Sequence, residues 1–154
     1  MISKLDLLTH HEAGHAAVAF SFGLRLKAVR INQVDDKTEP ADGQEPTSYQ
    51  NVVMRLAGSR AEMVLDEDSL SHSTLNVEDE HLIETCLEEC FAHRLQCHTP
   101  EEAGHIYSRV RDRLAYRCEG IVRDMWPAIQ RLAAELAKRS ELSGEEVERI
   151  LAGW

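Results

Sequence analysis

The sequence is poor in aromatic residues and in long apolar segments, and its basic residues are outnumbered by acidic ones. Phe, Trp and Tyr make up 5% of the 154 residues, so a core must be built mainly from Leu, Val, Ile and Ala. Lys and Arg number 17 against 27 Asp and Glu, and the net charge of −10 argues against nucleic acid or an anionic membrane surface as a partner. No segment approaches the roughly 18 consecutive apolar residues of a membrane span.

The N-terminal segment also lacks the apolar centre of a secretory signal. We therefore expect a cytoplasmic protein whose four cysteines, at positions 86, 90, 97 and 118, are reduced thiols rather than disulfides. A chain of this length suits one domain with a substantial core, and no internal repeat or second domain is visible. We expect a single domain over residues 1–154.

Apolar periodicity and capping signals predict a mainly helical fold. Helices are expected at about residues 4–22, 49–67, 77–95, 100–125 and 127–140, with a last short helix after Ser143. Pro127 is expected to break or kink the chain between two of them. Alternating Val29 and Ile31 predict a strand, and the polar segment 34–48 predicts a surface loop. The expected fold is therefore mainly α, with a small β element beside the first helix.

The most informative motif is His-Glu-Ala-Gly-His at residues 11–15, inside the first expected helix. Residues four apart lie on one face of a helix, so His11 and His15 can direct their imidazoles at one metal ion. Glu12 follows about 100° further round the helix, where a general base can take a proton from metal-bound water. H-E-x-x-H is typical of zinc peptidases, with Zn²⁺ held by three protein ligands. A core helix with two hydrogen-bonded histidines would match the pattern too.

Several segments together resemble one family. HHEAGHAAVAF, residues 10–20, resembles the opening of the peptidase domain of FtsH-type AAA+ zinc proteases, the M41 peptidase family. KAVRIN is similar to the strand that follows the metal helix in that family, and LSGEEVERIL to its C-terminal segment. RLAGSRAEMVL is similar to a later family helix, with matches at positions 56, 58, 61 and 62 and four neighbouring differences. The resemblance keeps the family order along nearly the whole chain and implies a zinc-dependent metalloendopeptidase.

The resemblance also implies a third zinc ligand, an Asp at the start of a later helix. The corresponding segment here, HSTLNVEDEHLIETC, lacks the family's glycine and offers three acids, Glu78, Asp79 and Glu80. Periodicity favours Asp79, because it heads the apolar stripe expected for this helix, whereas Glu80 shares a face with Glu84. All three acids would also suit a helix N-terminus without any metal.

Other candidate site residues have weaker patterns. Glu62 is a candidate to hydrogen-bond a metal-bound imidazole, and equally a solvated acid. Cys86 and Cys90 are four apart on a helix but lack the regular second ligand pair of a closed zinc site, so packing in the core is expected for both. His10 cannot begin an H-E-x-x-H match and is expected to be an exposed neighbour of the motif.

The sequence therefore predicts a zinc metallopeptidase-like domain with His11, His15 and Asp79 as metal ligands and Glu12 as general base. No G-x-x-x-x-G-K-[ST] phosphate loop is present, so hydrolysis would be independent of ATP in this chain. The expected substrates are small or unfolded polypeptides, and the expected partners are a separate ATPase and further copies of the chain. The alternative is a non-catalytic zinc-binding or metal-free assembly module that keeps the peptidase fold.

Overall fold

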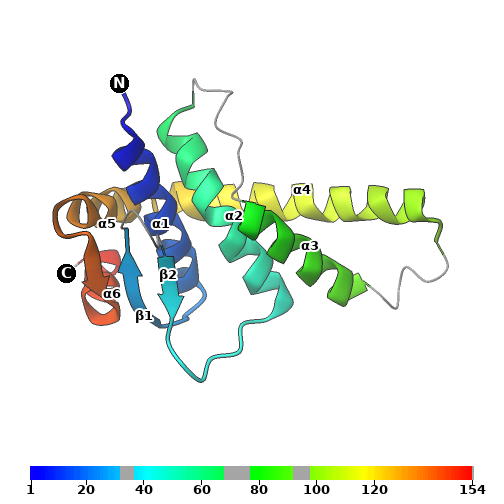
Figure 1. Cartoon of the computed structure of the whole chain (residues 1–154), viewed down its shortest axis with the longest axis horizontal. Helices are drawn as coiled ribbons and strands as arrows, with labels where there is room; N and C mark the ends of the chain where they lie inside the picture. The colour runs from blue at the N-terminus through cyan, green and yellow to red at the C-terminus, as the bar shows by residue number, and fades with distance from the viewer. Residues whose placement is uncertain (32–36, 68–76, 92–97, 154) are drawn as a thin grey trace.

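The computed structural model describes residues 1–31, 37–67, 77–91 and 98–153, and of residues 77–80 and 91 the backbone alone. These residues form six helices and three short strands: α1 (Lys4–Ser21), β1 (Leu26–Arg30), β2 (Lys37–Pro40), α2 (Ser48–Leu65), α3 (Val77–Phe91), α4 (Pro100–Asp124), α5 (Trp126–Arg139), β3 (Glu141–Ser143) and α6 (Gly144–Leu151). The expectation of a mainly helical fold with a small β element beside the first helix is confirmed (Figure 1).

The predicted helix starts are formed by capping boxes. The hydroxyls of Ser3, Thr99 and Ser143 each accept a hydrogen bond from the backbone N–H three residues on. The acidic side chain at that position in turn accepts a hydrogen bond from the backbone N–H of the cap residue. The break expected near Pro127 is also present, since α5 begins at Trp126 and places the proline in its first turn. A proline is tolerated there because its missing N–H would have no partner within the helix.

The prediction of a surface loop over residues 34–48 is wrong for residues 37–40, which form β2, whereas residues 41–47 form no helix or strand and residues 34–36 lie outside the described residues. The strand pairs antiparallel with β1, and Thr38 lies opposite Val29. Glu39 of β2 contacts Arg30 Nη2 at 2.6 Å and Lys27 Nζ at 3.5 Å across the pair. Backbone pairing with β1 and ion pairs between the two strands stabilise β2. Its sequence has no alternation of apolar and polar residues from which a strand could be predicted. On the other side of β1 lies β3, which was not predicted because three residues carry no readable pattern.

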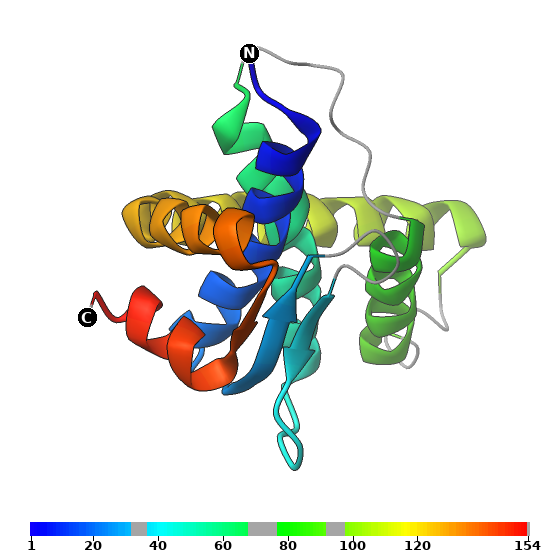
Figure 2. The ribbon, with the colours of Figure 1, turned by 60° about the vertical axis from the view of Figure 1, so that its left-hand side comes forward.

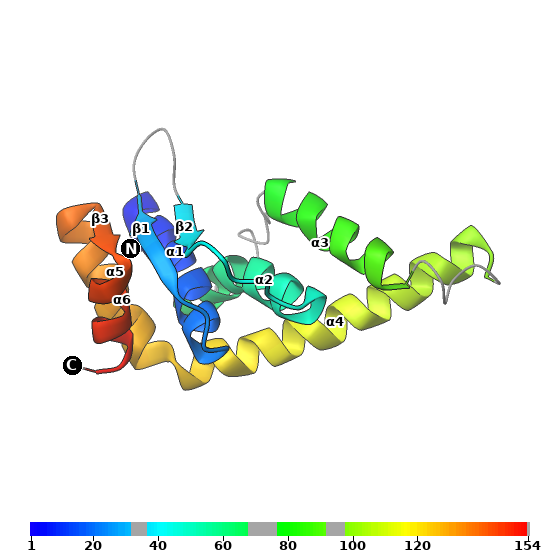
Figure 3. The same cartoon turned by 90° about the horizontal axis from the view of Figure 1, so that it is seen from below.

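The motif helix α1 is the centre of the fold. It packs against the sheet, α2 and α5 (Figures 2 and 3), and Ala13, Ala16 and Ala17 on it are fully buried. Gly14 allows α2 to approach closely, because a Cβ there would lie 2.7 Å from the backbone oxygen of Ala57. This contact sets the α1–α2 distance and therefore the space beside the histidines.

The other helices build outward from α2. α3 packs on α2 through the buried Ile83 and Leu87, and α4 packs on it with Cys118 and Val122 fully buried. The C-terminal end of α3 and the N-terminal end of α4 extend away from the central helices (Figure 3). Within the described ranges, no helix combines the length and the apolar character needed to cross a membrane.

Candidate metal centre

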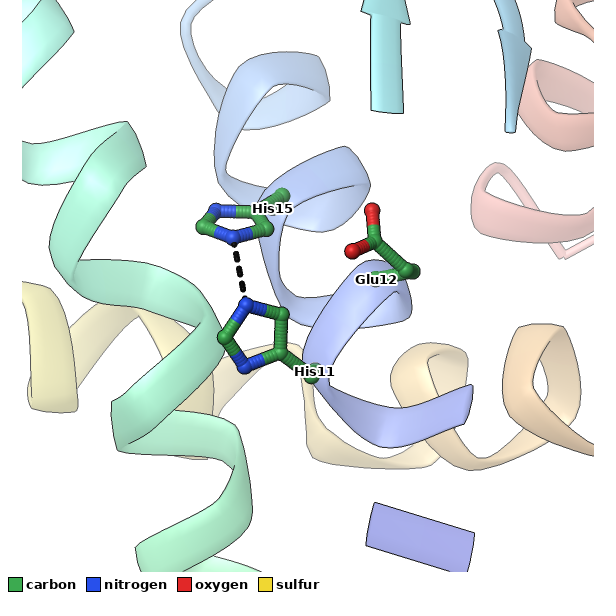
Figure 4. Close-up of side chains that lie close together, drawn as sticks. All are labelled: His11, Glu12 and His15. Carbon is green, nitrogen blue, oxygen red and sulfur yellow. Dashed lines mark hydrogen bonds between the residues drawn. The ribbon is translucent and has the colours of Figure 1, made fainter. Parts of the chain in front are cut away.

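The His-Glu-Ala-Gly-His motif occupies the middle of α1. The imidazoles of His11 and His15 project from one face of the helix, one turn apart, on the side where α2 lies (Figure 4). The ring planes meet at 79° with centroids 4.7 Å apart. His11 is 9% exposed and His15 is half-buried, so the pair lies at the α1–α2 interface with one side open to solvent.

Each imidazole is held through its Nδ1 atom. His11 Nδ1 lies 2.5 Å from Oε1 of Glu62, and His15 Nδ1 lies 2.6 Å from the backbone oxygen of Met54. A carbonyl oxygen and an ionised carboxylate only accept hydrogen bonds, so both Nδ1 atoms donate. Neutral imidazoles then carry their lone pairs on Nε2, the tautomer in which histidine ligates a metal through that atom.

The two Nε2 atoms converge on a common point. They lie 3.0 Å apart, drawn as the dashed line in Figure 4. Two lone pairs at this distance repel unless a proton or a metal ion is shared between them. Zn–N bonds of about 2.0–2.1 Å at a tetrahedral angle separate two nitrogen ligands by about 3.3 Å. The observed spacing is thus close to what tetrahedral zinc requires.

Gly58 leaves the space that an ion would use. A Cβ at this position of α2 would lie 2.5 Å from His11 Nε2 and 2.6 Å from His15 Nε2. Any side chain at position 58 would therefore compete for the point on which both lone pairs converge. Ala57 and Ala61 lie close to Gly14 of α1, so together with Gly58 they form a surface of small residues on the side of α2 that faces the motif.

Glu12 supplies the carboxylate of the group. It is 5% exposed, and one of its oxygens lies within 4.8 Å of a ligating nitrogen of each histidine. It leaves α1 on another side than the imidazoles, with one oxygen directed toward His15 and the other away from it (Figure 4). Oε2 accepts a hydrogen bond of 2.7 Å from the hydroxyl of Thr38 in β2. Sequence reasoning missed Thr38, because a lone β-branched residue between charged neighbours gave little sign of a strand.

The third predicted ligand, Asp79, lies in the first turn of α3, but its side chain and those of Glu78 and Glu80 lie outside the described residues. The described part of α3 shows the register on which the prediction rests. Ile83, one turn after Asp79, is fully buried, whereas Glu84, one turn after Glu80, is exposed. The N-terminal end of α3 is also the end that lies toward α1 (Figures 1 and 3). Asp79 as ligand stays a prediction.

Of the remaining candidate residues, some contact the site and others do not. Glu62 contacts an imidazole, and its side chain is only 16% exposed, so the solvated alternative is wrong. Cys86 is half-buried against the core as expected, but Cys90 is exposed, so core packing is wrong for Cys90. His10 is half-buried rather than exposed, with its ring centroid 5.5 Å from that of Trp126 and the two rings tilted by 32°. Within the described residues, the only group of three or more His, Cys, Asp or Glu side chains that could hold a metal ion is His11, Glu12 and His15.

No protein-family model matches the chain, and no curated protein matches it either. The likeness to M41 peptidases therefore stays a prediction from the sequence. What the structure contributes is a pair of imidazoles each held through Nδ1, a glycine beside their Nε2 atoms and an adjacent buried carboxylate.

Proposed function

We propose that the chain is a zinc-dependent metallopeptidase of the FtsH type that hydrolyses small or unfolded polypeptides without ATP. The observation that carries this proposal is the convergence of two Nε2 atoms at 3.0 Å, each imidazole being held by an acceptor on its Nδ1. A buried histidine pair with a purely structural role needs neither the cradle at Gly58 nor a carboxylate next to it.

The residues proposed to hold the ion are His11, His15 and Asp79. Glu62 and the Met54 carbonyl would keep the two imidazoles in their ligating tautomer, as acceptors behind metal-bound histidines usually do. When bound, zinc would polarise the substrate carbonyl and lower the pKa of a coordinated water to about 7.

Glu12 is proposed to carry the proton. Its carboxylate would accept a proton from the attacking water as the oxygen adds to the carbonyl carbon of the peptide bond. It would then donate that proton to the amine nitrogen as the C–N bond breaks, which leaves a carboxylic acid and an amine. Glu12 is only 5% exposed, so water screens the electrostatic interactions of its carboxylate less than it would at the surface.

Replacing Glu12 with Gln tests the catalytic part of the proposal. The variant should keep about one zinc per chain and lose at least about 100-fold of the rate on an unfolded casein or a short unstructured peptide. The matched control is Glu145→Gln, an exposed acid at the start of α6, which should leave both readouts unchanged. Activity that survives Glu12→Gln would rule out this base. Zinc binding with no hydrolysis by the unmodified protein would favour the non-catalytic alternative.

Replacing the three competing acids tests the ligand set. Asp79→Ala should weaken zinc binding more than Glu78→Ala or Glu80→Ala, measured by competition with a chromophoric chelator. Equal effects at all three positions would reject Asp79 as the ligand. A zinc content well below one per chain after metal-replete expression would reject the site altogether.

A further inference from the structure

We propose that Thr38 of β2 is a positioning residue that holds the Glu12 carboxylate in its working orientation. This inference rests on the proposed peptidase function, in which Glu12 moves the proton. It also makes a statement about the protein without metal, so it can be tested separately.

The contact joins two elements that are far apart in the sequence. Thr38 Oγ1 lies 2.7 Å from Glu12 Oε2 and 3.1 Å from the backbone oxygen of Glu12. The hydroxyl has one hydrogen, and the shorter distance together with the charge of the carboxylate assigns it to Oε2. Within the part of the chain that the structure describes, no other side chain donates to this carboxylate.

The residues that lie beside Thr38 on the neighbouring strands of the sheet are apolar, in contrast to its hydroxyl. Thr38 pairs with Val29, and Val29 pairs with Leu142 on the next strand. Residues directly opposite one another in a sheet share a face. Val29 and Leu142 are 0% and 1% exposed, so this face is otherwise apolar. Thr38 is the polar member of this row, and its hydroxyl is directed at the Glu12 carboxylate.

Neighbouring charges fix the register that aims the hydroxyl. Glu39 follows Thr38 and is held by Arg30 at 2.6 Å and by Lys27 at 3.5 Å, both on β1. A shift of one residue would turn Thr38 to the opposite face of the sheet. These cross-strand pairs therefore keep Thr38 directed at α1.

A hydrogen bond from Thr38 to only one of the two Glu12 carboxylate oxygens is compatible with a role of Glu12 as general base. The bond restrains the flexible glutamate side chain, while the second oxygen keeps its lone pairs for the substrate water. Without the hydroxyl, a buried carboxylate would have to turn toward water or another donor to be hydrogen-bonded. The carboxylate would then spend less time in the orientation that the reaction needs.

The test compares Thr38→Val, which has nearly the same shape without the hydroxyl, with Thr38→Ser, which keeps it. Thr38→Val should lower kcat by about 10- to 100-fold with KM changed less than threefold, the size expected for a misplaced catalytic group. Thr38→Ser should restore most of the rate, and zinc content should stay at one per chain in both. Thr85→Val, whose hydroxyl contacts only the backbone of α3, should behave as the unmodified protein.

The second readout needs neither metal nor activity. A crystal structure of zinc-free Thr38→Val should show the Glu12 carboxylate in a different rotamer, and zinc-free Thr38→Ser should show the original one. An unchanged Glu12 rotamer in Thr38→Val would overturn the positioning role whether or not the protein is a peptidase. An active protein whose kcat is unaffected by Thr38→Val would overturn it as well. An inactive unmodified protein with the expected rotamer change would instead reject the proposed function.

Discussion

Gly58→Ala provides the sharpest test of the metal centre. The added methyl carbon would lie 2.5 Å from His11 Nε2 and 2.6 Å from His15 Nε2. Carbon and nitrogen atoms in contact are normally about 3.5 Å apart, so both rings must move by about 1 Å. Imidazoles are the ends of side chains and can turn aside without shifting the backbone. We therefore expect a variant that folds but whose two Nε2 atoms no longer converge.

The expected magnitude follows from metal linkage. Free zinc at 100 times its dissociation constant stabilises a folded protein by about 2.7 kcal/mol. For a chain of this size that corresponds to a rise in melting temperature of about 5–11 °C. Thermal unfolding with and without zinc should show this rise in the unmodified protein, and Gly58→Ala should show less than a quarter of it.

Two other glycines separate the metal effect from general effects of Gly→Ala. At Gly120, on the exposed side of α4, a Cβ would meet nothing within 4 Å. Gly120→Ala should therefore stabilise the helix by up to about 1 kcal/mol and keep the full response to zinc. At Gly14 the Cβ would meet backbone at 2.7 Å, so Gly14→Ala should destabilise the zinc-free protein by about 1–3 kcal/mol. A Gly58→Ala variant with an undiminished zinc response would refute the location of the ion.

Two further predictions concern the histidine support and a buried thiol. Glu62→Gln keeps a hydrogen-bond acceptor near His11 Nδ1 but removes the negative charge. It should weaken zinc binding by about 10- to 100-fold, measured by competition with a chelator. An unchanged zinc affinity would mean that the charge of Glu62 does not strengthen His11 as a ligand. Burial raises the pKa of the fully buried Cys118 thiol to about 12, from its ordinary value of 9.0. The unfolded chain loses this proton above pH 9 while the folded chain retains it until about pH 12, so stability should fall with rising pH in that window. At pH 10 the loss should be about 1.4 kcal/mol by urea unfolding, and Cys118→Val should lack that part of the slope; an identical slope in the variant would contradict the assignment.

Local signals in the sequence determined the helices and the face that carries the motif. A capping box depends on residues three apart, and an apolar stripe on residues three or four apart, so Ser3 and its neighbours were sufficient to predict α1. The same helical spacing put His11 and His15 on one face. It also placed Asp79 one turn before Ile83, which the structure shows to be buried.

Tertiary structure alone decided what surrounds the imidazoles. Glu62 lies 51 residues from His11 along the chain, and Met54 contributes a backbone oxygen that no side-chain pattern can reveal. The hydroxyl of Thr38 reaches Glu12 from a strand that exists because β1 pairs with it. Gly58 could be recognised as a small residue, but not as the one that faces both Nε2 atoms. Residue spacing predicts which side chains lie on the same face of a helix or strand. Which groups contact those side chains depends on how elements that are distant in the sequence pack together.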